Sequence, residues 1–231
     1  QIGSHLPNAL KEDEFHLVYQ PQYDKGELIG VEALLRWNSP LLGMISPEVF
    51  IKIAEEESQM RAITKVVFEL LKKELSSIHA KNPDIKIAIN LSASQLMDDQ
   101  CMKGLQELHT LTGVPAKNLE IEITESAILG NVDLISDRLN EFKKNNIKVA
   151  IDDFGTGFST MTHLEQIPAD RLKIDKSFVM GYQDDTDGNI ASLIISTAST
   201  LGLEVIAEGV ETKAQKTFLE NQGCTMHPGN Y

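Results

Sequence analysis

The stretch "VAIDDFGTG" at residues 149–157 decides the fold. It begins as a short apolar run from Val149 to Ile151, continues into two adjacent carboxylates, Asp152 and Asp153, and ends in a glycine-containing turn. A short run rich in β-branched residues is typical of a parallel strand that is covered on both faces. Two charges at the end of such a strand need a neutralising partner, because an unpaired buried charge is costly. The stretch therefore predicts a strand that ends in a polar site.

Runs of the same kind recur along the chain and alternate with helix-like stretches. The other expected strands cover residues 16–22, 30–37, 85–92, 119–126, 170–175, 203–209 and 224–231. Expected helices cover 60–80, 97–112, 131–145, 188–201 and 212–222, and a further helix starts with Ser46 as N-cap and Pro47 as its first residue. The short "YDKGEL" connection at 23–28 predicts that the first two strands form an antiparallel hairpin.

Eight strands with intervening helices favour an α/β fold, a modified TIM (β/α)8 barrel with an antiparallel first strand. The alternative is an open doubly wound sheet. Polar residues favour the barrel, because they recur late in one strand after another, where a barrel brings all of them to one mouth. An open sheet would spread them along an edge. These residues are Glu32, Asn90, Glu122, Asp152, Asp153, Lys173, Asp175 and Glu208.

The chain has 231 residues and a formal net charge of −13, and we expect it to form a single domain over residues 1–231. This charge disfavours binding to nucleic acid polymers and anionic membranes, so an anionic ligand would need a metal ion or well-placed cations. No run of about 18 apolar residues predicts a membrane span. Two cysteines without metal-like spacing indicate a reducing cytoplasm. The chain starts at Gln1 and stops at Tyr231, so we expect a domain excised from a longer protein. One option is the cytoplasmic portion of a membrane-anchored sensor.

Side chains alternate between the two faces of a strand, which predicts which residues face the barrel lumen. Glu120 and Glu122 share one face of their strand, and Lys173 and Asp175 share one face of theirs, so the polar faces are expected to line the barrel lumen. Carboxylates that converge on one mouth repel each other unless a cation neutralises them. Oxygen ligands from Asp, Glu and Asn suit Mg²⁺ or Mn²⁺ rather than zinc.

Adjacent Asp152 and Asp153 can serve two ions, and paired metal ions clamp the attacking water and the leaving oxygen of a phosphate ester. Lys173 is then available to orient that water, and Arg36 offers a planar fork for phosphate oxygens. Taken singly, each acidic residue is more commonly a helix N-cap or a solvated loop residue. Together, at corresponding strand ends, they indicate a site. "FGTGFS" at 154–159 lacks the third glycine of a dinucleotide motif and is interpreted as an active-site loop.

Six short motifs in this order and spacing resemble the EAL-domain family of cyclic-di-GMP phosphodiesterases, and the resemblance runs from "YQPQYD" at 19–24 to the end. The motifs are "EALLRW" (32–37), "INLS" (89–92), "EITES" (122–126), "DDFGTG" (152–157), "LKIDKSFV" (172–179) and "EGVET" (208–212). The resemblance implies a modified TIM barrel with one antiparallel strand. It also implies metal-dependent hydrolysis of one phosphodiester bond of cyclic di-GMP to linear pGpG in bacterial signalling.

The resemblance also assigns roles to individual residues. It implies that Asp152 bridges two Mg²⁺ or Mn²⁺ ions, that Asp153 helps to hold the second ion, and that Lys173 lies by the attacking water. Glu208 matches a catalytic carboxylate, and Arg36 matches a contact to substrate phosphate. The remaining matches are first-metal ligands together with Asp152 (Glu32, Asn90, Glu122), supporting acids (Asp175, Glu211) and the glutamate that holds the loop after "DDFGTG" (Glu125). Family members often dimerise near this loop and often carry sensory or diguanylate cyclase domains, so we expect a homodimer and such flanking domains.

One position departs from the family pattern. After Gly223 and Cys224 the family usually has three residues and then Gln-Gly, whereas this chain has Pro228 at the position of the glutamine. Proline offers neither a side-chain amide nor a backbone donor. The chain also stops before the family's last C-terminal segment, so the eighth strand is expected to be incomplete. Two alternatives therefore stand beside hydrolysis: a receptor that binds cyclic di-GMP without cutting it, and a protein-interaction module that binds no nucleotide.

Overall fold

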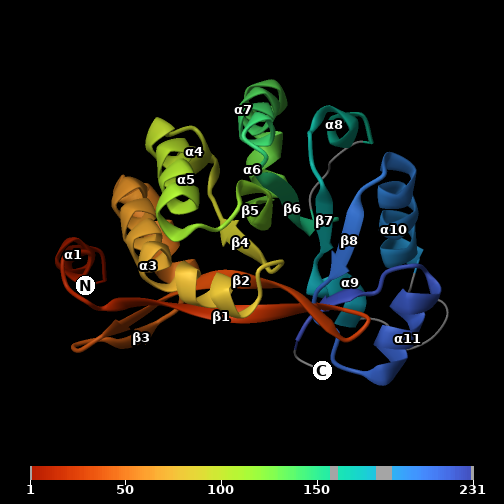
Figure 1. Cartoon of the computed structure of the whole chain (residues 1–231), viewed down its shortest axis with the longest axis horizontal. Helices are drawn as coiled ribbons and strands as arrows, with labels where there is room; N and C mark the ends of the chain where they lie inside the picture. The colour runs from red at the N-terminus through yellow and green to blue at the C-terminus, as the bar shows by residue number, and fades with distance from the viewer. Residues whose placement is uncertain (1, 157–160, 181–188, 230–231) are drawn as a thin grey trace.

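A computed structural model of the chain describes residues 2–156, 161–180 and 189–229. Eight strands close into a barrel (Figure 1). Around the barrel the order is β1-β9-β8-β7-β6-β5-β4-β2, and the pairing of β2 with β1 closes the ring. The strands are β1 (Phe15–Asp24), β2 (Glu27–Ser39), β4 (Lys86–Asn90), β5 (Leu119–Thr124), β6 (Lys148–Phe154), β7 (Arg171–Ile174), β8 (Glu204–Ala207) and β9 (Met226–Pro228).

β1 is antiparallel to both of its neighbours, β2 and β9, whereas the pairings from β2 and β4 round to β8 and β9 are parallel. This arrangement confirms the modified TIM barrel with an antiparallel first strand and rules out the open sheet. The predicted hairpin is also confirmed, since the β1–β2 register ends at Asp24 and Glu27. Lys25 and Gly26 form its turn with φ angles of 50° and 86°, which suits glycine at the second position.

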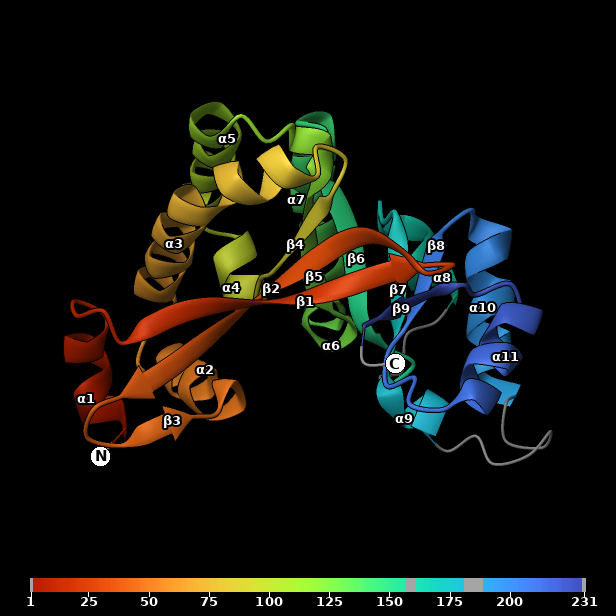
Figure 2. The same cartoon turned by 60° about the horizontal axis from the view of Figure 1, so that its bottom comes forward.

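The β1–β2 hairpin reaches beyond the barrel. β2 pairs with β4 only from Gly30 to Ala33, and its later residues pair with β1 and with the short strand β3 (Gly43–Ile45). Figure 2 shows β1 and β2 crossing the molecule and projecting toward α1, α2 and β3. The end of β2 that carries Arg36 therefore lies outside the parallel sheet.

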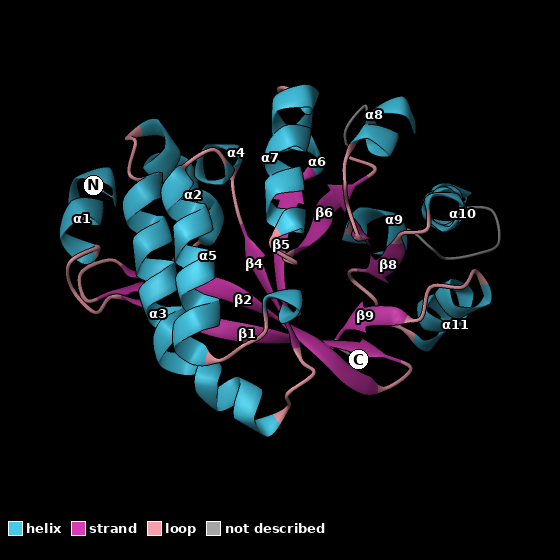
Figure 3. Cartoon of the chain, turned by 45° about the horizontal axis from the view of Figure 1, so that its top comes forward, coloured by secondary structure: helices cyan, strands magenta, loops and turns pink. Residues whose placement is uncertain are grey.

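Helices cover the outside of the strands (Figure 3). They are α1 (Ile2–Ala9), α2 (Pro47–Glu56), α3 (Met60–Lys81), α4 (Ala93–Leu96), α5 (Asp99–Thr112), α6 (Glu125–Leu129), α7 (Val132–Lys144), α8 (Met161–Gln166), α9 (Lys176–Met180), α10 (Asn189–Leu201) and α11 (Lys213–Asn221), with a 3₁₀ turn at Ala116–Asn118. All six expected helices are present. α1, β3 and the short helices α4, α6, α8 and α9 were not expected.

Five of the eight expected strands were predicted too long, namely those at 85–92, 119–126, 170–175, 203–209 and 224–231. The strand predicted at 119–126 ends at Thr124, because Thr124 caps α6 by accepting a hydrogen bond from the backbone N–H of Ala127. The strand predicted at 224–231 covers Met226–Pro228 within the described part, and residues 230–231 lie outside it. Although short, β9 pairs with β1 over three residues and with β8 at Met226, and so it completes the barrel.

Two hydrophobic clusters hold the fold together. The larger cluster fills the layer between the strands and the helices, and it includes Ile121, Leu172 and Ile174, which are at most 1% exposed. The smaller cluster lies at the projecting end of β1 and β2, where α1 and α2 pack around Trp37 and Phe50. Burying these apolar side chains is the main contribution to stability, at about 25 cal/mol per Å².

Candidate active site

A single buried lysine collects four carboxylates at the carboxyl end of the barrel. The Nζ atom of Lys173 lies 2.6 Å from Glu122 Oε2, 3.0 Å from Glu208 Oε1, and 3.2 Å from both Glu32 Oε2 and Asp152 Oδ1. The Lys173 side chain is 1% exposed. Five residues far apart in the sequence thus meet in one cluster, which we call the carboxylate ring.

Strand geometry places the ring. Lys173 and Glu122 alternate along β7 and β5 with residues that are buried in the outer core, such as Leu172 and Ile121. The lumen-facing arrangement predicted for Glu122 and Lys173 is therefore confirmed. Glu208 follows β8 directly, and its backbone N–H donates to the carbonyl of Ile174 at 3.0 Å, which holds it at the same level.

A second charged layer lies below the ring in the lumen. Arg171, which is fully buried, donates to Glu120 Oε1 at 2.8 Å, to Glu204 Oε2 at 2.7 Å and, more weakly, to Gln22 Oε1 at 3.4 Å. Lys86 adds a second ion pair to Glu204 at 3.1 Å. Sequence reasoning placed Glu120 in the lumen but missed Arg171, although its position two residues before Lys173 on the same strand was a usable signal.

The pKa values of several carboxyl groups at the ring are raised, which means that their charged forms are disfavoured. A bound metal ion would favour the charged forms. Burial raises the pKa of Glu122 and of Glu208, and neighbouring carboxylates raise both further. Burial likewise raises the pKa of Asp153, with Asp152 and Asp175 adding to the shift. Burial acts to lower the pKa of Lys173, but Glu122, Asp152, Glu32 and Glu208 outweigh it, so the ammonium group stays protonated.

Two observations fit the ring to a cation. Oxygen atoms of Asp152, Asp153 and Glu208 lie within 4.8 Å of one another, close enough to share one ion. Glu122 Oε1 is buried and has no hydrogen-bond partner within the described residues. Such an oxygen is costly unless it accepts a hydrogen bond or binds a metal. The donor atoms are all oxygen, which suits Mg²⁺ or Mn²⁺.

The other predicted residues have separate positions. Asn90 donates from Nδ2 to Glu32 Oε1 at 2.7 Å and so belongs to the ring. Arg36 lies further along β2 than Glu32, and its Nη1 donates to the carbonyl of Leu35 at 3.0 Å. Glu125 is 2% exposed and accepts the backbone N–H of Gly155 at 2.9 Å, so it contacts the loop after "DDFGTG".

Two acidic residues have simpler surroundings. Asp175 accepts a hydrogen bond from the backbone N–H of Ser177 at 2.9 Å and so caps the start of α9. Its negative charge also contributes to the raised pKa of Asp153. Glu211 is exposed, and its backbone N–H donates to Gln215 Oε1 at 2.8 Å. Within the described part of the chain, no hydrogen bond or ion pair joins Glu211 to the ring.

Pro228 is buried in β9 and lies opposite Gln22 of β1. Gln22 reaches Arg171 with Oε1, so residue 228 is on a lumen-facing register. Gln22 Nε2 is buried without a hydrogen-bond partner among the residues that the structure describes. The position that the family pattern gives to glutamine therefore borders the lumen, and here it carries no amide.

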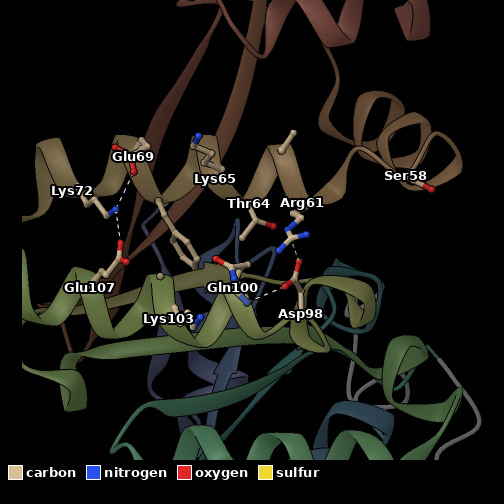
Figure 4. Close-up of a pocket in the computed structure, with 13 residues that line it drawn as sticks. Ser58, Arg61, Thr64, Lys65, Glu69, Lys72, Asp98, Gln100, Lys103 and Glu107 are labelled. Atoms are coloured by element: carbon tan, nitrogen blue, oxygen red, sulfur yellow. Dashed lines mark hydrogen bonds and ion pairs between the residues drawn. The ribbon is translucent and has the colours of Figure 1, made fainter.

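A cleft of about 690 Å³ opens beside the ring. Asn90 and Glu122 line it, and α2, α4 and α6 supply much of the rest, including Ile51, Glu55 and Ser94. A separate hollow of about 550 Å³ lies on the outer surface between α3 and α5 (Figure 4). The ion pair of Lys72 with Glu107 crosses it, but the hollow contains none of the predicted site residues. In the described part of the chain, no helix combines the length and the apolar character needed to cross a membrane.

The fold is a closed α/β barrel with one antiparallel strand, and a cluster of carboxylates lies at the carboxyl end of its strands. These features define the class of α/β barrels with an acidic site suited to metal ions. The sequence profile of the EAL domain matches residues 4–231, and the chain belongs to this family.

The chain is similar in sequence to several curated proteins. The chain is 35% identical to cyclic di-GMP phosphodiesterase NbdA of Pseudomonas aeruginosa, covering 99% of this chain and 30% of NbdA. It is 31% identical to cyclic di-GMP phosphodiesterase PdeR of Escherichia coli, covering 99% of this chain and 35% of PdeR. Among solved structures, the PaMucR phosphodiesterase in complex with c-di-GMP superposes with a TM-score of 0.91 at 34% identity, covering 99% of this chain and 94% of that chain. The chain thus spans about a third of the length of these curated relatives.

Proposed function

We propose that this chain hydrolyses one phosphodiester bond of cyclic di-GMP to linear pGpG, with Mg²⁺ or Mn²⁺ as cofactor. The observation that carries the proposal is the carboxylate ring, which borders a cleft through Asn90 and Glu122. Relatives named as cyclic di-GMP phosphodiesterases support the substrate and the reaction.

Charge balance supports two divalent ions. The ring and the adjacent Asp153 contribute five carboxylates and one ammonium group, which leaves four negative charges. Two divalent cations would neutralise them. Asp152 would serve both ions, Asp153 the second ion only, and Glu32, Asn90 and Glu122 the first. When bound, such ions lower the pKa of water and stabilise the charge on phosphoryl oxygens.

The protein's own groups then divide the remaining work. Lys173 stays protonated, so it donates hydrogen bonds and offsets negative charge instead of accepting a proton. Glu208 has a raised pKa and is 25% exposed at the side chain, which suits a group that takes a proton from water near neutral pH. Arg36 would bind the non-bridging phosphate oxygens through its planar fork.

The partners follow from the same proposal. Cyclic di-GMP is the expected ligand, and a homodimer and flanking sensory or diguanylate cyclase domains are proposed by family resemblance. Residues 157–160 of the loop linked to dimer contacts lie outside the described residues. We also propose a cytoplasmic location. A binding-only receptor is the alternative, and the complete ring argues against it.

The test is product formation. The chain is incubated with cyclic di-GMP and Mg²⁺ or Mn²⁺, and nucleotides are separated by chromatography. We expect pGpG from the unmodified chain and none from Glu32→Ala. Glu56→Ala is the matched control, because Glu56 is an exposed carboxylate on α2 outside the ring, and it should keep full activity. Binding without any pGpG, at enzyme concentrations equal to the substrate, would favour the receptor.

A further inference from the structure

Glu14 is a buried carboxylate outside the carboxylate ring. It directly precedes β1 and is 6% exposed. Its Oε2 accepts the indole N–H of Trp37 at 2.7 Å, and its Oε1 lies 3.2 Å from His5 Nε2 in α1. Its backbone carbonyl accepts the N–H of Asn38 at 2.9 Å. Glu14 therefore clamps two consecutive residues of β2, one through its side chain and one through its backbone.

Trp37 is held on several sides. It is fully buried, and its ring stacks on Phe15 with centroids 5.2 Å apart and meets the edge of Phe50 at 5.8 Å. The ring of His5 is nearly parallel to it, with centroids 6.1 Å apart and an interplanar angle of 3°. Burial acts to raise the pKa of Glu14, but the hydrogen bonds of Trp37 and His5 hold it below its ordinary value, so the carboxylate is charged.

Arg36 depends on this anchor for its position. It precedes Trp37 in β2 and so projects from the opposite face, the one that also carries Glu32. The last pairing of β2 with the parallel sheet is at Ala33, so Arg36 lies three residues beyond the barrel's own support. Its side chain donates a hydrogen bond to the neighbouring carbonyl of Leu35, and no carboxylate in the described part of the chain forms an ion pair with it. The backbone of Arg36 pairs with His16 of β1, and Trp37 packs in the smaller hydrophobic cluster on the opposite face of β2.

We infer that Glu14 is a positioning residue: by locking Trp37 it sets the direction from which Arg36 reaches substrate phosphate. This inference rests on the proposed function, because it takes Arg36 as the phosphate contact. It assigns a role to a residue outside every motif of the resemblance. Through His5, the same clamp ties helix α1 to the face of β2 that lies opposite Arg36.

The test is a double-mutant cycle on the full chain with Mg²⁺ and cyclic di-GMP. Glu14→Gln keeps one acceptor but loses the charge, and Trp37→Phe keeps the ring but loses the donor. For either variant we expect KM to rise by about tenfold with kcat within about twofold of the parent. In an Arg36→Ala background, Glu14→Gln should leave KM unchanged, because the residue it positions is gone.

The matched control is Tyr19→Phe. Tyr19 lies on β1, the strand that Glu14 precedes, and it donates a 2.7 Å hydrogen bond to Glu74 of α3. Its loss should lower the melting temperature without changing KM. An unchanged KM in Glu14→Gln, an additive effect in the Arg36→Ala background, or an equal rise of KM in Tyr19→Phe would overturn the inference.

The positioning role can be tested separately if the chain does not hydrolyse cyclic di-GMP. If the unmodified chain makes no pGpG, the same cycle is run on the dissociation constant of cyclic di-GMP, measured by calorimetry in Ca²⁺. A tenfold weakening that disappears in the Arg36→Ala background would then support the positioning role without catalysis. The absence of such weakening would overturn it. Trp37→Phe provides the second route to each outcome if Glu14→Gln does not fold.

Discussion

Lys173 carries the positive charge that lets four carboxylates meet at the top of the lumen. Replacing it by methionine would leave buried carboxylates without their counter-charge. We expect Lys173→Met to abolish activity and to lower the free energy of unfolding of the metal-free chain by about 3 kcal/mol or more. Urea unfolding with and without Mg²⁺ measures this, and added Mg²⁺ should restore part of the loss.

Arg171→Met is the matched control for that prediction. Arg171 lies in the layer below the ring and pairs with Glu120 and Glu204, away from the candidate metal ligands. Its replacement should also destabilise the chain, but Mg²⁺ should stabilise this variant only as much as the parent, so the difference from the parent should persist. Equal recovery of both variants in Mg²⁺ would contradict a metal site located at the ring.

The raised pKa values of Glu122, Asp153 and Glu208 predict a pH-dependent response to metal. A carboxyl whose folded pKa is raised holds its proton longer in the native state. Its contribution to stability is therefore lost as pH rises from the unfolded pKa through the folded one. Protons then compete with metal at low pH. The increase in melting temperature caused by Mg²⁺ should be larger at about pH 8 than at about pH 6. The Asp152→Asn variant should show little increase at either pH, and a pH-independent increase in the parent would count against the prediction.

Residue-level chemistry was only partly predictable. Acids at strand ends, such as Glu122 and Asp152, were found because parallel strands carry their carboxyl ends to one mouth. The simpler interpretation of a helix cap describes the contacts of Asp175. Glu14 was missed, because its partner Trp37 lies 23 residues away and no local pattern marks it. Arg171 was missed although its spacing from Lys173 places it on the same face of β7, because its partner Glu120 lies 51 residues away.

At the scale of elements, β9 carries the departure from the family pattern. Pro228→Gln would place an amide on the lumen-facing register opposite Gln22. We expect turnover to rise by about tenfold or more, because the resemblance places that glutamine near the metals and attacking water. Pro228→Ala is the control, since it restores the backbone N–H without an amide. Equal effects of the two variants would assign any gain to the backbone alone.

The loop after β6 makes a second prediction at this scale. Gly155 has a φ angle of +100°, and a Cβ there would lie 2.7 Å from the ring of Phe178 and 2.9 Å from Ile194. Gly155→Ala should lower stability by more than about 1 kcal/mol and reduce activity, because the loop is held against Glu125. Gly202→Ala provides the comparison: its φ is +70° with no atom within 4 Å. It should cost only about 1 kcal/mol and leave activity unchanged. Parallel denaturation curves and rates decide between these outcomes.

The six main helices and the eight barrel strands were predictable, whereas β3 and the additional short helices were not. The six expected helices and eight strands are present because apolar periodicity marks elements of this length. Helix α1 has Pro7 inside it, and its stability comes from Leu6 and Ala9 packing in the cluster around Trp37. A three-residue strand such as β3 depends on pairing with β2, which no local pattern specifies.

At the scale of the whole molecule, closure of the barrel is what brings the site together. Glu32 near the start and Glu208 near the end meet at Lys173 because β1 joins β2 on one side and β9 on the other. The sequence favoured a barrel through the polar strand ends, but closure depends on the pairing of β1 with β9, which is separated from it by some two hundred residues.

The most direct test of metal-dependent hydrolysis is to assay one sample twice, without and with metal. The chain is incubated with cyclic di-GMP after chelation by EDTA, excess Mn²⁺ is then added, and pGpG is quantified by chromatography before and after. The account predicts no pGpG in the chelated sample and steady formation once Mn²⁺ is present. Equal pGpG before and after addition, or none in either state while cyclic di-GMP still binds, would contradict it.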